Sequence, residues 1–241
     1  NGIVENLDEF VLQGANSETG ICQGGNIKGA IMSDQVQTFG KLPISFNWLG
    51  VDSAILSAHK IGGPKGVGAL ILADGIDAMS FIKGGGQEQG RRSGTENLFG
   101  IIGFGASSLA AVKDLTDGVW ERVAELRNKM EMRIADIASD AIFIGKDVKR
   151  LPNTSNFSVP GWKGETQVMN MDLAGFAISA GSACSSGKVK SSQALKAMGY
   201  NDITASSAIR VSLGPSTTEK EIMSFVDAWS KAYKKYAVKT A

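Results

Sequence analysis

The sequence predicts an α/β protein that folds as two compact units. Its 241 residues, 43% hydrophobic and 20% charged, are enough to bury a sizeable core and argue against a disordered chain. The first part of the chain carries short apolar runs typical of strands, and the middle carries two stretches of helical periodicity. We place the boundary inside the first of these helices, near Gly103, which divides the chain into domains 1–103 and 104–241.

Four short apolar runs in the first part predict strands, because turn residues bound each run and each is too short for a helix. They cover residues 11–15, 29–32, 53–57 and 67–73. Parallel pairing of the first two needs a crossover of about a dozen residues, usually helical, and the Gly24-Gly25 pair makes this connection a poor helix. Either a surface helix has been lost here or residues are missing from this chain. The second alternative predicts a break in the backbone near 23–26.

The remainder of the chain is richer in helical periodicity. Apolar residues recur at spacings of three and four over 97–116 and 119–139, which predicts two helices. A strand is predicted at 141–144, and further apolar runs follow at 156–159 and 175–179. The last predicted helix, 218–236, begins with acidic and ends with basic residues, as the helix dipole favours.

The charge and cysteine content exclude several classes of function. A net charge of +1 provides no bulk attraction to nucleic acid or to an anionic membrane. No uninterrupted apolar run reaches the length of about 18 residues that a spanning helix needs, and residues 1–10 lack a signal pattern. Cys22 and Cys184 lie far apart, which suits a reducing compartment, and we interpret Cys22 as a small buried apolar residue.

A lysine at the end of the predicted strand 53–57 is the first candidate for chemistry. Ser57, His59 and Lys60 precede a glycine-rich turn, at the strand end where open α/β sheets place ligands. An aldehyde cofactor needs an amine nucleophile, and a phosphate needs hydroxyl and N–H donors. A lone lysine here would be an ordinary surface residue.

A second candidate pair follows the strand 29–32. Asp34 could hold the ring nitrogen of a pyridoxal group protonated, and Gln37 could donate a hydrogen bond to its phenolic oxygen. The alternative for Asp34 alone is a helix N-cap.

Three further segments carry polar chemistry. The glycine-rich stretch 84–97, with two arginines and Thr95, could cradle an anion at a helix N-terminus, although Arg91 and Asn97 could equally be ordinary surface and helix-start residues. Cys184 lies in a Ser/Gly-rich loop near Lys188, as an accessible thiol would. Arg210, alone in an apolar run, is either a structural ion-pair partner or a clamp for a carboxylate.

Together, these segments resemble the cysteine desulfurases, pyridoxal phosphate enzymes of the class V aminotransferase family, from about Asn16 to the C-terminus. The resemblance rests on the ordered set Asp34-x-x-Gln37, Ser57-x-His59-Lys60, 84–97, 182–187 and 210–214. It implies the aspartate aminotransferase-like fold type I of PLP-dependent transferases. The chain would then comprise a partial large domain with a mainly parallel sheet and an α+β C-terminal small domain that carries the cysteine loop.

The resemblance also implies which residues bind pyridoxal 5'-phosphate. Lys60 would form the covalent bond to its aldehyde, Asp34 would pair with the ring nitrogen, and Gln37 would contact the phenolic oxygen. Ser57 and His59 would hold the phosphate. No metal is expected.

Other residues would serve the substrate and the partner subunit. Thr95 would reach the phosphate of the partner subunit's cofactor, which implies a homodimer, and Cys184 would accept the sulfur. Arg210 would hold the carboxylate of L-cysteine together with Asn16 and Ser17. The family usually has a second Asn at the place of Ser17, so we expect weaker carboxylate binding here.

The implied reaction converts L-cysteine to L-alanine and leaves a persulfide on Cys184. The sulfur would pass to an iron-sulfur scaffold or another acceptor protein, for cluster assembly or tRNA thiolation, in the bacterial cytoplasm or the mitochondrial matrix. The long Ser/Lys-rich loop 182–192 resembles the subgroup that serves general iron-sulfur assembly. Direct contact with nucleic acid or a membrane is not expected.

Two alternatives stay open from the sequence. One is a selenocysteine lyase or another class V lyase that uses the same cofactor. The other is a catalytically inactive interaction subunit, because the family's N-terminal portion, with a phosphate-binding turn and a ring-stacking side chain, has no counterpart in this chain and His59 is its single histidine.

Overall fold

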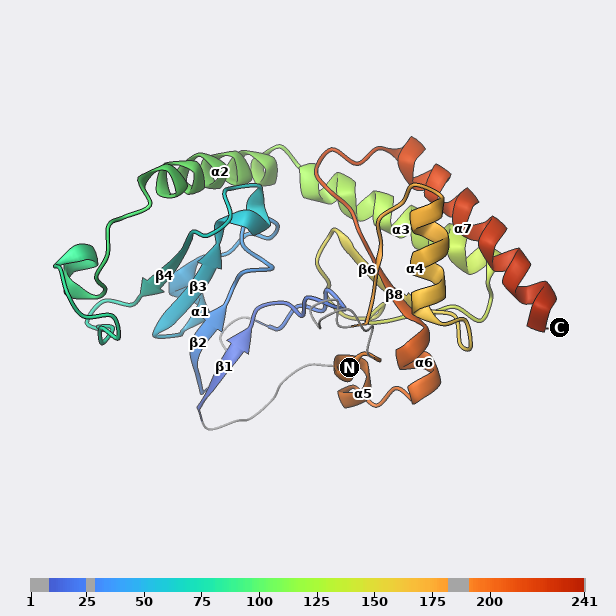
Figure 1. Ribbon diagram of the computed structural model, residues 1–241, viewed down its shortest axis with the longest axis horizontal. Helices are drawn as coiled ribbons and strands as arrows, with labels where there is room; N and C mark the ends of the chain where they lie inside the picture. The colour runs from blue at the N-terminus through green and yellow to red at the C-terminus, as the bar shows by residue number, and fades with distance from the viewer. Residues whose placement is uncertain (1–8, 25–28, 182–190, 241) are drawn as a thin grey trace. The chain divides into compact units, whose positions relative to one another are not determined.

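The computed structural model describes residues 9–24, 29–181 and 191–240, which form two compact units (Figure 1). The first unit contains the described residues up to Ala15 together with Gln23–Asp117, and the second contains Asn16–Cys22 together with the chain from Gly118 onward. The units therefore divide after the long helix that holds Gly103 and not inside it. The domains 1–103 and 104–241 stay a prediction for the whole protein.

The first unit is built on a four-stranded sheet in the order β1-β2-β3-β4. Its strands are β1 (Phe10–Gln13), β2 (Ala30–Asp34), β3 (Ser53–Ser57) and β4 (Gly68–Leu72). The first three strands are parallel, and β4 runs antiparallel to β3. All four strands predicted from the sequence are present, and the sheet is mainly parallel as expected.

The connection between β1 and β2 leaves the first unit and returns to it. Residues Asn16–Cys22 belong to the second unit, and Gln23 N donates to Gly14 O at 2.9 Å where the chain comes back. The described part of this connection contains no helix. The predicted break at 23–26 falls partly on residues 25–28, which lie outside the described residues.

Four helical segments accompany this sheet: α1 (Phe46–Leu49), the 3-10 turns η1 (Ala58–Ile61) and η2 (Gln87–Gly90), and α2 (Leu98–Thr116). Asn97 caps α2 through its Oδ1, which accepts from Gly100 N at 3.1 Å. The helix packs closely on the turn after η1, because a Cβ at Gly103 would lie 2.5 Å from Pro64 Cγ. By length and composition α2 is apolar enough to cross a membrane, and 11% of that apolar window is buried in the structure; one such helix by itself does not define a membrane protein.

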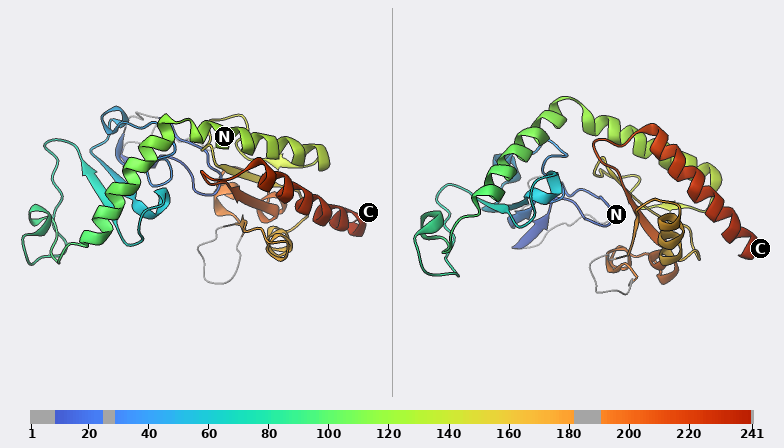
Figure 2. Two further views of the ribbon diagram at one scale, coloured as in Figure 1. Left: turned by 90° about the horizontal axis from the view of Figure 1, so that it is seen from above. Right: turned by 45° about the horizontal axis from the view of Figure 1, so that its top comes forward.

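The second unit has an antiparallel sheet in the order β5-β6-β8-β7. Its strands are β5 (Ile142–Phe143), β6 (Thr154–Ser158), β7 (Ser179–Ala180) and β8 (Ala208–Ser212). Its helices are α3 (Val119–Ile137), α4 (Gly164–Leu173), α5 (Gln193–Ala197), α6 (Asp202–Ser207) and α7 (Glu219–Thr240). Figures 1 and 2 show α3 alongside α7, as their contacts require. The predicted helix pair and C-terminal helix are confirmed.

The core of the second unit is dominated by large side chains. Trp229 and Phe157 are fully buried, with ring centroids 5.7 Å apart, and the indole N–H of Trp229 donates to Gln167 at 3.2 Å. Helix α3 contributes Met130 and Ile134 to the core of this unit, both fully buried. The spacing of these α3 residues is the one the sequence predicts.

Candidate functional site

Four of the predicted cofactor residues lie at one edge of the first unit's sheet. Strands β2 and β3 are parallel, and Asp34 pairs in register with Ile55, so the carboxyl ends of both strands face the same edge. Asp34 is the last residue of β2 and Ser57 the last of β3, and η1 follows directly with His59 and Lys60. The topology therefore brings an acid, a hydroxyl, an imidazole and an amine to this edge.

The turn after β2 is held by its own hydrogen bonds. The Asp34 carboxylate accepts from Val36 N at 2.9 Å, and its backbone carbonyl accepts from Gly14 N at 2.8 Å. Asp34 thus caps a turn and not a helix, which answers the N-cap alternative. Gln37, in the same turn, is half-buried.

The turn after β3 presents Lys60. Ser57 Oγ and His59 Nδ1 are 2.8 Å apart, and the side chains of His59 and Lys60 are exposed. Gly62 ends η1 with a φ of 81°, in the left-handed region that favours glycine, while its N–H bonds to Ala58 O. A short, hydrogen-bonded turn therefore holds the lysine outward at the sheet edge.

Lys41 is the charged residue that sequence reasoning missed at this site. It is 7% exposed, and its Nζ donates to Gln37 O at 2.8 Å. Burial, and then the charge of Lys60, lower the pKa of Lys41 to about 8. Lysine is normally a surface residue, so Gly40-Lys41-Leu42 carries no sequence signal for a buried ammonium.

Thr95 does not join this group. Because β4 runs antiparallel to β3, with Ala73 N donating to Asp52 O at 2.9 Å, the glycine-rich segment leaves the sheet at the edge opposite Lys60. Thr95 itself is exposed, between Gly94 and the N-cap of α2. In this segment Arg91 pairs with Asp77 at 2.7 Å and is therefore more than a solvated side chain.

The predicted substrate residues meet in the second unit. Arg210, on β8, donates to the backbone carbonyl of Ser17 at 2.9 Å and to Ser179 Oγ at 3.2 Å. No carboxylate in the described part of the chain pairs with it. Asn16 Oδ1 accepts from the backbone N–H groups of Glu18 and Thr19, so it stabilises the turn that carries the exposed Ser17.

The two cysteines differ in what the structure shows. Cys184 lies outside the described residues. Cys22 is 5% exposed, and burial raises the pKa of its thiol. The interpretation of Cys22 as a buried apolar residue is confirmed.

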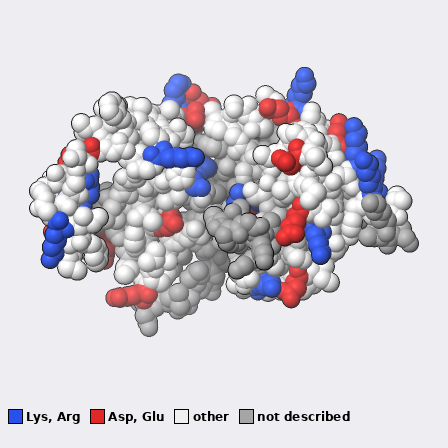
Figure 3. All heavy atoms as spheres, viewed as in Figure 1, with Lys and Arg blue, Asp and Glu red and all other residues white. Residues whose placement is uncertain are grey.

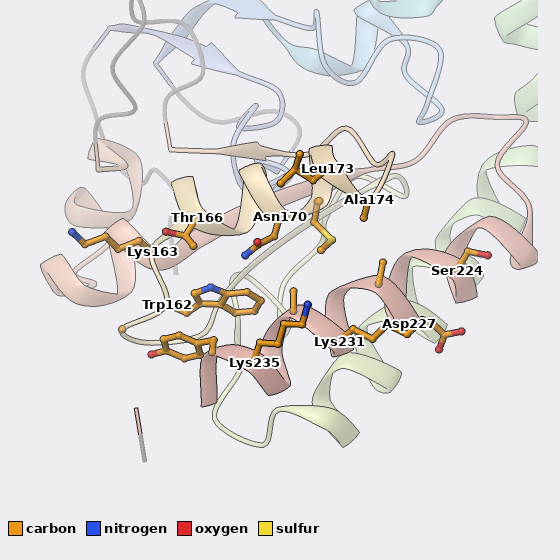
Figure 4. A pocket seen from close by; sticks show the side chains of 15 residues that line it. Trp162, Lys163, Thr166, Asn170, Leu173, Ala174, Ser224, Asp227, Lys231 and Lys235 are labelled. Carbon is orange, nitrogen blue, oxygen red and sulfur yellow. The ribbon is translucent and has the colours of Figure 1, made fainter. Parts of the chain in front are cut away.

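A large groove lies elsewhere, within the second unit. It has a volume of about 960 Å³ and runs between α4 and α7 (Figure 4). Trp162 and Tyr236 stack at one end, and Lys163, Lys231 and Lys235 lie around it. None of the predicted site residues lines this groove. Figure 3 shows acidic and basic residues interspersed on the visible face, in line with the small net charge.

Comparison with known proteins defines the family. Residues 14–225 match the model of the aminotransferase class-V family, so the chain belongs to it. It is 38% identical over 203 residues to the cysteine desulfurase IscS of Dictyoglomus turgidum, covering 84% of this chain and 51% of that protein. It is 39% identical over 219 residues to a cysteine desulfurase of Cereibacter sphaeroides, covering 88% and 56%. The chain thus spans about half the length of these curated relatives.

Solved structures agree with the sequence relatives. A NifS-like protein from Rickettsia africae aligns with a TM-score of 0.85 and 30% identity, over 97% of this chain and 67% of that one. A second NifS-like protein gives a TM-score of 0.84 and 31% identity over 97% and 66%. These similarities confirm the predicted fold class, the type I fold of PLP-dependent enzymes.

Proposed function

We propose that this protein is a pyridoxal phosphate-dependent cysteine desulfurase. The observation that carries the proposal is the shared sheet edge, where parallel strands bring Asp34 next to the Ser57–Lys60 segment. Relatives named cysteine desulfurase, at 38% and 39% identity, support the same activity.

The residues at this edge have the chemistry that pyridoxal 5'-phosphate requires. A carboxylate suits the ring nitrogen, a hydroxyl and an imidazole suit the phosphate, and an exposed amine suits the aldehyde. Asp34, Ser57, His59 and Lys60 would take these roles, and Gln37 would contact the phenolic oxygen. When bound, the cofactor supplies an electron sink for the α-carbon of the substrate.

The chain's own groups would carry the remaining steps. Arg210 would hold the carboxylate of L-cysteine, since its guanidinium has no acidic partner among the described residues. The Lys60 amine would accept the α-proton. The Cys184 thiolate would attack the substrate sulfur, so that an S–S bond forms as the C–S bond breaks, the carbon side takes a proton, and alanine is released.

The proposed role of Thr95 extends to a second subunit. Its segment leaves the sheet at the edge opposite Lys60, which suits a residue that serves the partner's cofactor in a homodimer. The persulfide would pass to an iron-sulfur scaffold or another acceptor protein. Because the relatives are bacterial, we place the protein in a bacterial cytoplasm.

Sulfide release from L-cysteine tests this proposal. The full chain, given pyridoxal phosphate and a thiol, should release sulfide and alanine in equal amounts, and Lys60→Ala and Cys184→Ser should each lower the rate at least about 100-fold. Lys65→Ala, an exposed lysine in the turn after η1, is the matched control and should keep the rate. Sulfide release that persists in Cys184→Ser would indicate a different lyase, and a folded chain that binds no cofactor would indicate an interaction subunit.

A further inference from the structure

Lys41 is a buried charge without an acidic partner among the described residues. Its side chain is almost enclosed, and no carboxylate of the described residues forms an ion pair with it. Buried ammonium groups are costly unless something compensates them. The carbonyl of Gln37, 2.8 Å from Nζ, is the partner that the structure shows. Such a residue calls for a functional explanation, because an apolar side chain would be less costly here.

The surroundings of Lys41 connect it to the cofactor residues. Its turn is closed by Lys41 N and Leu42 N, which both donate to Thr38 O. The same turn packs tightly on η1, since a Cβ at Gly40 would lie 2.7 Å from Ile61 Cγ2. Lys41, whose Nζ donates to the Gln37 carbonyl, therefore lies in a turn that packs against η1, the segment that carries Lys60.

The charged groups around Lys41 are few. From η1, Lys60 acts on it electrostatically, and it is a like charge. From α2, Ala111 packs on Gly40 and Phe104 packs on Phe39, and neither carries a charge. On its own turn, Asp34 is engaged by Val36 N and forms no ion pair with it. Two ammonium groups thus share this region, and an anionic ligand would relieve their repulsion.

We propose that Lys41 is a positioning residue of the cofactor site, whose buried ammonium fixes the turn that carries Gln37 and adds a second positive charge in range of Lys60. The inference rests on the proposed function, because pyridoxal phosphate is the anion that the site would receive. A bound phosphate and phenolic oxygen would favour the protonated form of Lys41. Binding near pH 8.5 should therefore be coupled to proton uptake by this residue.

Calorimetry with pyridoxamine 5'-phosphate tests this coupling without a covalent bond, since this probe has no aldehyde. Titrations at pH 8.5 in two buffers of different ionisation enthalpy give the number of protons taken up on binding. We expect Lys41→Met to bind at least about tenfold more weakly than the unchanged chain and to take up about half a proton less. Lys41→Arg should restore the affinity to within about threefold, yet show the same loss of uptake, because arginine stays charged.

Lys65→Met is the matched control and should behave as the unchanged chain. Circular dichroism melts of every variant separate a folding defect from a loss of binding, and Lys41→Arg keeps the test decisive if Lys41→Met does not fold. Proton uptake equal to that of the unchanged chain in either Lys41 variant would overturn the inference, as would unchanged affinity in Lys41→Met. If the unchanged chain and the Lys65→Met control are folded but bind no probe, the proposed function itself fails.

Discussion

The two units bury their side chains in different ways. In the second unit, large residues such as Trp229 and Phe157 have no exposed surface. In the first unit, the buried apolar cluster at the sheet consists of Leu12, Ala30 and Val51. Large apolar side chains there stay outside instead, with Phe99 92% and Phe81 89% exposed. The second unit therefore has a core of large side chains, whereas the buried cluster at the first unit's sheet is built from smaller ones.

The units also treat buried charge differently. In the second unit, Arg150 donates to both carboxylate oxygens of Glu131, at 2.7 and 3.0 Å, and both side chains are less than a tenth exposed. In the first unit, Lys41 is just as buried but has a carbonyl in place of a carboxylate. Arg127 in the second unit is also buried and donates to Leu151 O and Asn128 Oδ1. What distinguishes Lys41 is therefore its place, at the sheet edge where we propose that an anionic cofactor binds. The comparison teaches that the proposed cofactor edge holds a buried charge without the counter-charge that Arg150 has.

The largest expected effect concerns the core of the second unit. Trp229→Ala should lower the free energy of unfolding by about 4 kcal/mol, because it removes a fully buried indole and leaves a cavity. Phe99→Ala, the exposed counterpart, should change it by less than about 0.5 kcal/mol. Chemical denaturation of both variants gives the values, and comparable losses would contradict the difference between the units.

The second largest effect on the free energy of unfolding is expected for the buried ion pair of Glu131 and Arg150. Glu131→Gln leaves Arg150 without its counter-charge, and we expect a loss of about 3 kcal/mol of unfolding free energy. Glu219→Gln is a suitable control, because its pair with Lys129 is exposed and should contribute less than about 1 kcal/mol. A loss in Glu131→Gln no larger than in the control would refute the structural role of the pair.

Lys41→Met should change the free energy of unfolding in the opposite direction, by raising it. The folded-state pKa of Lys41, about 8, is below the ordinary value of 10.5, so the unfolded chain binds more protons between these values and stability rises with pH across that window. At pH 7 the ammonium costs about 3 kcal/mol, offset by about 1 kcal/mol from its hydrogen bond. The variant should therefore be about 2 kcal/mol more stable at pH 7. Denaturation of both proteins at pH 7 and pH 10 checks this prediction. If stability rises between these pH values as much in Lys41→Met as in the unchanged chain, the prediction is wrong.

The smallest effect is expected at Ser17. Ser17→Asn adds an amide beside Arg210 on the turn held by Asn16, and it should lower KM for L-cysteine about threefold through one further carboxylate hydrogen bond. Steady-state kinetics on the full chain checks it. Thr19 lies in the same turn but is unsuitable as a control because it is buried. Glu165→Gln, on the exposed surface of α4, serves as the neutral control instead. An unchanged KM in Ser17→Asn would remove Ser17 from the proposed carboxylate site.

The sequence predicts the elements of this fold well where apolar periodicity is strong. Strand β3 and helix α3 follow their predicted ranges closely, because a short apolar run bounded by turn residues and apolar residues at spacings of three and four are strong local signals. The short helices α1, α5 and α6 were missed, since four to six residues give too little periodicity and their caps, such as Asn201 Oδ1 with Thr204 N, look like turns. The path of 16–22 into the second unit was missed as well, because pairing between distant segments leaves no local pattern.

The candidate site was only partly predictable. Asp34, Ser57, His59 and Lys60 could be assembled because parallel strands end at one edge. The segment with Thr95 leaves the sheet at the edge opposite Lys60 because β4 is antiparallel to β3. The composition of β4 does not encode this strand direction. Lys41 was missed because a single lysine gives the same sequence pattern whether its side chain is buried or exposed.

One measurement tests the central claim most directly. The full chain is incubated with pyridoxal 5'-phosphate, reduced with sodium borohydride and digested, and the modified peptide is located by mass spectrometry. The account predicts a single pyridoxyl group on Lys60, absent from the Lys60→Ala variant. A label spread over exposed lysines such as Lys65, with none on Lys60, would contradict it.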